Sequence, residues 1–263
     1  DCGSSGLRLA VFRVEDRPAG SLVEERASPY PGPFDDPHAW RHGLIQLVAG
    51  LPPAIRRQVA AIALDGTSGT LLLCRPDGSL GAGPLSRAIP YHQACPEQAD
   101  LARRLAGTGP AASASGSLAR ALRLLALASP EATLTDWLLR HQADWLMGWL
   151  LGDWRWGEEG NNLRLGWDPR QQRWSGHIDE QPWGQALPTI RASGQRLGNL
   201  STEAATSLSL PADCQVVAGS TDANAAVLAA DPGPGDGITV LGTTLVLKRF
   251  LPGPLEGPGL SNH

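Results

Sequence analysis

The chain has 263 residues, of which 42% are apolar, so it can form one large domain or two small ones around a sizeable core. Its net charge of −4 argues against a nucleic-acid-binding surface, because binding a phosphate backbone requires a dense basic field. The apolar runs are too short to span a bilayer, so we expect a cytoplasmic protein with neither a membrane nor a nucleic-acid partner.

The cysteines define no metal or disulfide framework. The chain has four of them, and none is in C-x-x-C spacing. They are Cys2, Cys74, Cys95 and Cys214. We therefore expect buried free thiols, as in a reducing compartment.

The first predicted strand covers residues 7–14 and is entered through a glycine-rich turn, DCGSSGLR at residues 1–8. The turn combines a glycine that allows close backbone approach, two hydroxyls that can donate to phosphoryl oxygens, an arginine that can neutralise charge, and an aspartate that can hold Mg²⁺. These residues are Gly3, Ser4, Ser5, Arg8 and Asp1. An ordinary hairpin turn is the alternative for this pattern taken alone.

Residues 15–36, rich in Pro, Gly and charge, are predicted to form a loop with at most one short strand. Apolar spacing predicts a helix over residues 38–48. Residues 59–64 are predicted to form a strand, and residues 71–74 the returning strand of a hairpin. The tip of this hairpin would be the polar turn DGTSGT at residues 65–70.

Residues 96–152 have a helical pattern that small residues interrupt at 107–117. The strongest helices are predicted at 117–127 and 134–151. The second helix carries an apolar stripe that we expect to be core, including Trp137, Trp145 and Trp149.

Residues 152–210 are predicted to be irregular, and their polar residues are best explained by structural roles. The polar residues expected to order the loop through backbone hydrogen bonds are Asn161, Asn162 and Asp168. His141 and His177 lack partners at metal-ligand spacing. Trp154 or Trp156 could stack on a sugar, but a packing role is the preferred interpretation.

A short buried strand at 215–218 leads into the sequence Gly-Ser-Thr-Asp and then into an alanine-rich helix at 223–230. Asp222 therefore lies at a strand-to-helix junction, where a carboxylate can accept a proton from a hydroxyl group. The alternative is that Asp222 only caps the helix.

Residues 231–237 (DPGPGDG) form a break typical of a linker between domains. Strands predicted at 238–241 and 245–250 flank a second glycine- and hydroxyl-rich turn, made of Gly242, Thr243 and Thr244. A strand, polar turn and strand thus recur three times, around Ser4, Ser68 and Thr243. Two such turns flanking an aspartate at a strand-to-helix junction favour phosphate chemistry over plain hairpins.

Six segments in this order resemble the FGGY family of carbohydrate kinases, within the actin/Hsp70/sugar-kinase superfamily. The segments are DCGSSGLR at 1–8, ALDGTSGTLLL at 63–73, HQADWLMGWLLG at 141–152, NNLRLGWDP at 161–169, VVAGSTDANAAVLAA at 216–230 and TVLGTTLVLK at 239–248. They are most similar to the xylulokinase-like branch that includes the D-ribulokinases of cyanobacteria and plants.

The resemblance implies an α/β, ribonuclease H-like or actin-like ATPase fold with a mixed five-stranded sheet flanked by helices. Residues 1–230 would form the N-terminal, sugar-binding domain, and residues 231–263 the hinge and the beginning of the nucleotide-binding domain. The adenosine motif would lie beyond residue 263. We therefore expect the chain to be part of a longer protein, and residues 1–263 alone to lack kinase activity.

The resemblance also implies the role of each site residue. Asp222 would be the catalytic base and a sugar contact, and Asp1 would hold Mg²⁺. The residues expected to bind ATP phosphates are Gly3, Ser4, Ser5, Arg8, Gly242, Thr243 and Thr244. The expected sugar contacts in the DGTSGT turn are Thr67 and Ser68.

The implied activity is ATP-dependent phosphorylation of a small ketose, with ATP and Mg²⁺ as cofactors. D-ribulose, giving D-ribulose 5-phosphate, is the preferred substrate. D-xylulose, or a noncatalytic sugar- or nucleotide-binding role, remains the alternative. One departure bears on the sugar, because His92 and Gln93 stand where relatives often carry Asn-Asp after the tyrosine. The sequence does not define an oligomeric state.

Overall fold

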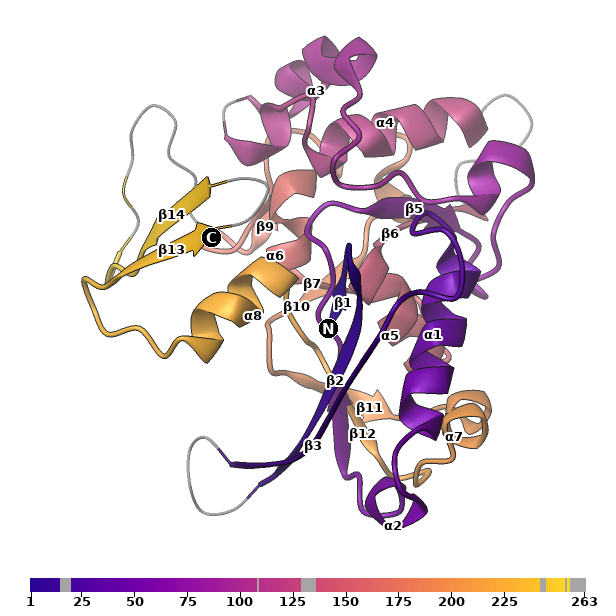
Figure 1. Cartoon of the computed structure of the whole chain (residues 1–263). Coiled ribbons are helices and arrows are strands. Elements are labelled where there is room, and N and C mark those ends of the chain that lie inside the picture. The colour runs from indigo at the N-terminus through magenta and orange to yellow at the C-terminus, as the bar shows by residue number, and fades with distance from the viewer. Residues whose placement is uncertain (15–19, 108, 129–135, 242–244, 254, 256–263) are drawn as a thin grey trace.

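The computed structural model describes residues 1–14, 20–107, 109–128, 136–241, 245–253 and 255. Its architecture is α/β, as expected (Figure 1). In Figure 1, α1, α5 and α7 lie together on one side of the central strands, with α3 and α4 above them.

The first sheet is antiparallel, in the order β1 (Cys2–Gly3), β2 (Gly6–Arg13) and β3 (Ser21–Ser28). β2 confirms the strand predicted at 7–14, whereas β3 is a full eight-residue strand in a region expected to be mainly loop. Gly6 begins β2 with a φ of 149°, and a Cβ there would lie 2.7 Å from the Ser28 carbonyl oxygen. Only glycine therefore allows β3 to pass this close to the turn.

The second sheet has β4 (Ala61–Ala63) parallel to β12 (Gln215–Val217), and β12 antiparallel to β11 (Arg196–Asn199). Parallel bridges from Gly66 to Cys2 and to Thr221 connect the two sheets, so that the strands form a mixed arrangement. The bounds of the helices that pack on these strands are α1 (Pro37–Ala49), α5 (Gln142–Leu151) and α7 (Thr202–Leu208). Trp40, Trp145 and Trp149 fill this core, as predicted for the last two.

The hairpin predicted over residues 59–74 is wrong. β5 (Leu71–Cys74) pairs antiparallel with β6 (Leu138–His141), while β4 pairs with β12. All four residues of β5 are buried, and β6 supplies three buried residues of its own. The polar turn at 65–70 therefore crosses from one sheet to another.

The helix predicted over residues 134–151 is wrong in its first half, where β6 precedes α5. A short apolar run suits a buried strand and a buried helix equally, so its periodicity did not separate them. Trp137, just before β6, packs in a second core with α3 (Ala99–Ala106) and α4 (Ser117–Ala128). These two helices confirm the helical pattern on either side of the break.

Short elements fill residues 152–210. They are β7 (Trp156–Glu158), α6 (Glu159–Asn162), β8 (Trp167–Asp168), β9 (Arg173–Trp174) and β10 (Thr189–Arg191). β7 and β10 are parallel, and β8 and β9 are antiparallel. A single turn of helix, α2 (Pro53–Arg56), precedes β4. 3-10 turns lie at Gly83–Ser86, Pro96–Gln98, Pro110–Ala112, Leu163–Leu165 and Gly184–Ala186.

The end of the described chain comprises α8 (Asp222–Ala229) and an antiparallel hairpin of β13 (Gly237–Leu241) and β14 (Leu245–Arg249), as predicted. The hairpin leaves large apolar side chains exposed, with Leu241 at 83%, Leu245 at 62% and Leu247 at 73%. The predicted turn residues between its strands, Gly242, Thr243 and Thr244, lie outside the described residues.

All four cysteines are free and buried, which confirms the prediction of unpaired thiols. Among the described residues, every helix is too short or too polar to cross a membrane.

Candidate active site

Three segments meet at one edge of the strands, just past the ends of β4 and β12 and at the start of β1. The Cys2 N–H donates to the Asp65 carbonyl at 2.7 Å, and the Asp222 N–H donates to the Gly66 carbonyl at 2.9 Å. A Cβ on Gly219 would lie 2.0 Å from the Leu64 carbonyl oxygen, so this crossing requires glycine. The sequence thereby brings the candidate base beside the DGTSGT turn.

The Asp222 carboxylate is held in place by backbone donors. It accepts a hydrogen bond from the Ala223 N–H at 2.7 Å and another from the Ser68 backbone. Burial raises its pKa, while these hydrogen bonds act in the opposite direction. Thr221, whose hydroxyl accepts from the Asn224 N–H at 3.1 Å, is the N-cap of α8. The interpretation of Asp222 as the helix cap is therefore wrong.

A second carboxylate, Asp65, lies in the same place. One of its oxygens accepts from the Ser220 N–H at 2.7 Å, and burial raises its pKa. Its charge in turn raises the pKa of Asp222. Sequence reasoning had placed Asp65 in the turn without giving it a role.

Lys248 on β14 is the only lysine of the chain. Its Nζ donates to the Ala223 carbonyl at 2.8 Å, and its charge lowers the pKa of Asp222. Burial lowers the pKa of Lys248, while the Asp222 carboxylate raises it. The β13–β14 hairpin thus contributes a cation to the first turn of α8, a contact that sequence reasoning missed.

The predicted phosphate turn lies between β1 and β2. Gly3 ends β1, and Ser4 and Ser5 are exposed at the tip. Arg8 is largely exposed, and its Nη1 lies 3.2 Å from Asp1 Oδ2. Backbone and hydroxyl donors at this tip are thus accessible to an anion.

Asp1 has one oxygen available for a cation. Its Oδ1 is buried and has no hydrogen-bond partner, unlike Oδ2, which contacts Arg8. Among the described residues, no three His, Cys, Asp or Glu side chains gather as a metal cluster. A single free carboxylate oxygen suits Mg²⁺ when phosphates and waters supply the other ligands.

The two predicted sugar contacts differ in accessibility. Thr67 is only 2% exposed, and its hydroxyl contacts Gln142 Oε1 at 2.8 Å and Thr70 Oγ1 at 2.7 Å. Ser68 is partly exposed, and its backbone donates to Asp222. Of the pair, Ser68 is therefore the more accessible, whereas the Thr67 hydroxyl is turned into the protein.

Arg120 on α4 joins the DGTSGT turn to the segment containing Gln93. Its guanidinium donates to the carbonyls of Gly69 at 3.1 Å, Pro90 at 3.1 Å and Gln93 at 3.0 Å, and also to that of Tyr91. Arg120 is fully buried, and burial lowers its pKa to about 10, so it stays charged near neutrality. The guanidinium thus holds the backbone of Gln93, the residue at which the sequence was expected to depart from the kinases it resembles.

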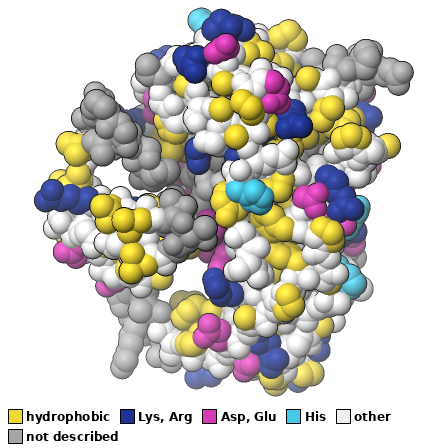
Figure 2. Space-filling view, turned by 45° about the horizontal axis from the view of Figure 1, so that its top comes forward, with side chains coloured by type: hydrophobic (Ala, Val, Ile, Leu, Met, Phe, Trp, Pro, Cys, Tyr) yellow, Lys and Arg dark blue, Asp and Glu magenta, His cyan; other side chains and the backbone are white. Residues whose placement is uncertain are grey.

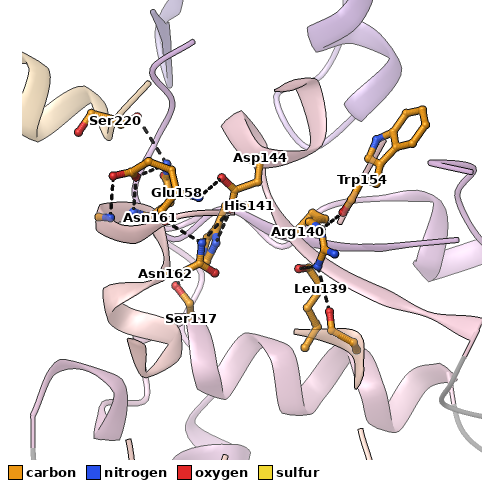
Figure 3. A network of polar contacts seen from close by, with 12 residues as sticks. Ser117, Leu139, Arg140, His141, Asp144, Trp154, Glu158, Asn161, Asn162 and Ser220 are labelled. Atoms are coloured by element: carbon orange, nitrogen blue, oxygen red, sulfur yellow. Dashed lines mark hydrogen bonds and ion pairs between the residues drawn. The ribbon is translucent and has the colours of Figure 1, made fainter. Parts of the chain in front are cut away.

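A buried polar network lies behind residues 220–222 (Figure 3). Glu158 accepts from Gly160, Asn161 and Ser193, and burial raises its pKa to about 7. The Asn161 amide reaches the Ser220 carbonyl at 3.5 Å, two residues before Asp222. The predicted ordering role of the asparagines is confirmed for this network.

Ser117, His141 and Asp144 form a chain in the same network, with 3.0 Å between Ser117 Oγ and His141 Nε2, and 3.5 Å between His141 Nδ1 and Asp144 Oδ2. The order resembles a nucleophile relay, but all three side chains are 0% exposed and no substrate can reach them. Of the two positions left open for a histidine without metal-ligand spacing, surface or core, His141 occupies the core. His177 is exposed, with Nδ1 2.7 Å from Glu180.

The two tryptophans considered as sugar platforms pack against protein groups. The Trp154 ring lies against Gly78 and Gly148, where a Cβ would approach within 2.2 Å and 2.4 Å of it. The Arg191 guanidinium lies 4.3 Å above the Trp156 ring. Both side chains therefore have the packing role that the sequence favoured.

Figure 2 shows a hollow between the part of the molecule that carries β13 and β14 and the rest, with acidic side chains inside it. By their contacts, the carboxylates of Asp222 and Asp65 and the Lys248 cation lie together at the start of α8. This set of groups can bind an anion and remove a proton from a hydroxyl group.

No protein-family model matches the chain. Among solved structures, it is similar to a carbohydrate kinase from Novosphingobium aromaticivorans, with a TM-score of 0.73 and 19% identity over 97% of this chain and 57% of that one. It is also similar to Plasmodium falciparum glycerol kinase with ADP, with a TM-score of 0.74 and 16% identity over 94% of this chain and 52% of that one. A xylulose kinase from Rhodospirillum rubrum gives a TM-score of 0.70 and 19% identity over 90% of this chain and 52% of that one.

The chain has the fold of the FGGY-type carbohydrate kinases, which confirms the fold class expected from the six sequence segments. It spans about half the length of the kinases that it matches.

Proposed function

We propose that the chain is part of an ATP-dependent carbohydrate kinase that phosphorylates a primary hydroxyl group of a small ketose. The observation that carries this proposal is the position of Asp222, whose carboxylate is held by the backbone of Ser68 and of Ala223 beside the DGTSGT turn. A fixed carboxylate, a positioned hydroxyl and donors for the phosphates are what phosphoryl transfer requires. The fold supports the class of reaction.

In this mechanism Asp222 accepts the proton of the ketose hydroxyl as that oxygen attacks the γ-phosphate. The Ser4–Ser5 turn and Arg8 bind and neutralise the phosphates, and Gly242, Thr243 and Thr244 provide the second phosphate-binding turn. Ser68 contacts the sugar, with Thr67 supporting the loop from beneath. Asp1 would hold Mg²⁺, which when bound supplies charge neutralisation at the phosphates.

The proposed substrate is D-ribulose, with D-xylulose as the second candidate. Ser68, the partly exposed hydroxyl residue of the DGTSGT turn, is short enough to leave room for a ketose beside Asp222 in this proposal. A noncatalytic sugar-binding role is the alternative from another class, and the intact Asp1, Arg8 and Asp222 count against it.

We further propose that residues 1–230 form the sugar-binding domain and residues 231–263 the hinge and the start of a nucleotide-binding domain. The exposed apolar residues of β13 and β14 support this, because a solvated hairpin seldom carries so much apolar surface. The share of the kinases that the chain covers agrees with it.

The test is ADP release by the full-length protein with and without ketose, over a panel that includes D-ribulose, D-xylulose, glycerol and gluconate. We expect release that depends on a ketose, with D-ribulose the best substrate by kcat/KM. Ketose-independent hydrolysis, or none, would favour the noncatalytic alternative. A preference for glycerol or gluconate would support the proposed kinase activity and contradict the proposed ketose substrate.

A pH-dependence prediction follows from Lys248. Its cation favours the ionised form of Asp222, which is the form that acts as base, so Lys248→Met should raise the pKa of Asp222. The acid limb of the kcat/KM profile should then move to higher pH, with a larger loss of activity below neutrality than above it. Arg249→Met, which removes the exposed neighbouring cation, is the matched control. An unmoved acid limb would remove Lys248 from the environment of the base.

A further inference from the structure

A continuous row of hydrogen bonds connects the phosphate turn with the DGTSGT turn through Tyr30 and Gln142. The Tyr30 hydroxyl donates to the Gly3 carbonyl at 3.0 Å, and Gln142 Nε2 donates to the Tyr30 hydroxyl at 3.1 Å. Gln142 Oε1 accepts from both the N–H and the hydroxyl of Thr67, at 3.1 Å and 2.8 Å. The row thus begins at the predicted phosphate site and reaches the predicted sugar loop.

The row continues past Thr67. Thr67 Oγ1 and Thr70 Oγ1 lie 2.7 Å apart, and Thr70 Oγ1 accepts from the Tyr91 N–H at 3.1 Å. The Tyr91 hydroxyl returns to Ser4 Oγ at 3.5 Å. Tyr91 therefore ends the row at its backbone N–H and contacts the phosphate turn through its hydroxyl.

Each bond in the row has a determined direction. The Thr67 N–H can only donate, so the Gln142 atom facing it is the carbonyl oxygen and the Gln142 amide nitrogen faces Tyr30. The Thr67 hydroxyl has one proton, which goes to Gln142, so Thr70 is the donor to Thr67. All bonds consequently point the same way, from Tyr91 to Gly3, an arrangement in which neighbouring bonds strengthen one another.

The row is shielded from solvent at its centre. Gln142 and Thr70 are 0% exposed and Thr67 is 2% exposed. Burial raises the pKa of Tyr30 above its ordinary range, so Tyr30 keeps the proton that it donates. A break in one bond therefore leaves buried partners unsatisfied and favours movement of the others.

The far end of the row is anchored by Arg120. Its guanidinium binds the carbonyl of Gly69, the residue before Thr70, and the carbonyl of Tyr91, the last member of the row. Arg120 therefore resists displacement of the DGTSGT turn on one side. A displacement on the other side is transmitted to Tyr30 through Gln142.

We propose that Gln142 and Tyr30 are positioning residues that couple the DGTSGT turn to the phosphate turn, so that binding at one changes the binding strength at the other. The substrates named for the two ends, a ketose and the phosphates of ATP, rest on the proposed function. Such coupling is reciprocal, because an effect of one ligand on the affinity of the other equals the reverse effect.

The first experiment needs no ligand and measures amide hydrogen exchange by NMR in the full-length protein. Tyr30→Phe removes only the hydroxyl next to Gly3. We expect exchange at the amides of Thr67 and Tyr91 to increase about fivefold or more, relative to amides of α4. Gln58→Leu changes an exposed glutamine whose amide donates to the Ala54 carbonyl, away from the row, and should leave these amides unchanged. Faster exchange confined to residues around Tyr30 would overturn the coupling, whatever the protein's function.

The second experiment measures binding of D-ribulose and of a nonhydrolysable ATP analogue, each with and without the other. We expect the ketose to increase the affinity for the analogue in the wild type, and Gln142→Leu to reduce this effect about fivefold or more. Tyr30→Phe combined with Gln142→Leu should have no greater effect than Gln142→Leu alone, because both act on one row. An unchanged effect of the ketose in Gln142→Leu, or additive losses, would overturn the coupling role. A wild type that binds neither ligand would reject the proposed function, and the exchange experiment would still decide the coupling.

Discussion

Asp222→Asn is expected to reduce ketose-dependent ADP release by a factor on the order of 10² or more, with a much smaller change in ketose affinity. Asparagine keeps the shape of the side chain and an oxygen for the Ala223 and Ser68 donors, so the start of α8 should be preserved. It cannot accept the proton of the ketose hydroxyl. The loss should therefore be in kcat, with the KM for the ketose changing by only a fewfold.

Steady-state kinetics at saturating ATP would check this prediction, with Asp213→Asn as the matched control at an exposed carboxylate. The melting temperature of both variants should be close to that of the wild type, which separates lost chemistry from lost folding. Turnover of Asp222→Asn within a fewfold of the wild type would exclude Asp222 as the base. A fall in affinity as large as the fall in kcat would instead make it a binding residue.

The parts of the fold that the sequence predicted are those that local residues decide. Gly6 at the start of β2, and the passage from strand β12 to the alanine-rich α8, are each specified within about ten residues of chain. Local glycines and strand residues were enough to predict the turn between β1 and β2 and the strand-to-helix junction at Asp222. The resemblance of six segments predicted the α/β fold, which the similarity to solved kinases confirms.

The errors came from pairings between distant segments. β5 is a buried four-residue strand whose partner, β6, lies more than sixty residues further along, and nothing in either sequence specifies that register. The hydrogen bond between Gln142 and Tyr30 spans 112 residues, and Lys248 contacts a carbonyl 25 residues before it. Asp65 and Lys248 acquire their effect on Asp222 only when three segments fold together, so sequence reasoning could not give them a role.

Arg120 provides the second large prediction, for stability. It is fully buried, and its partners include four backbone carbonyls in two loops, those of Gly69, Pro90, Tyr91 and Gln93. Arg120→Met removes the donor from all four acceptors, of which the bond to Gly69 is buried and the bonds to the other three are partly buried. Because each buried unsatisfied group costs about 1–3 kcal/mol, the free energy of unfolding should fall by roughly 3 kcal/mol or more.

The measurement is urea unfolding at neutral pH, with Arg123→Met as the matched control. Arg123 lies on the same helix and is partly exposed, with an ion pair to Glu97 at 3.7 Å, so its loss should change the free energy of unfolding by about 1 kcal/mol or less. Arg120→Lys should fall between the two, because an ammonium group keeps the charge but cannot reach carbonyls on both loops at once. A loss under about 1 kcal/mol in Arg120→Met would show that the two loops hold their conformation without the guanidinium. The Arg120 hydrogen bonds would then result from the conformation of the two loops and would not determine it. The Tyr91 end of the hydrogen-bond row would in that case be anchored by the backbone pairing of β5.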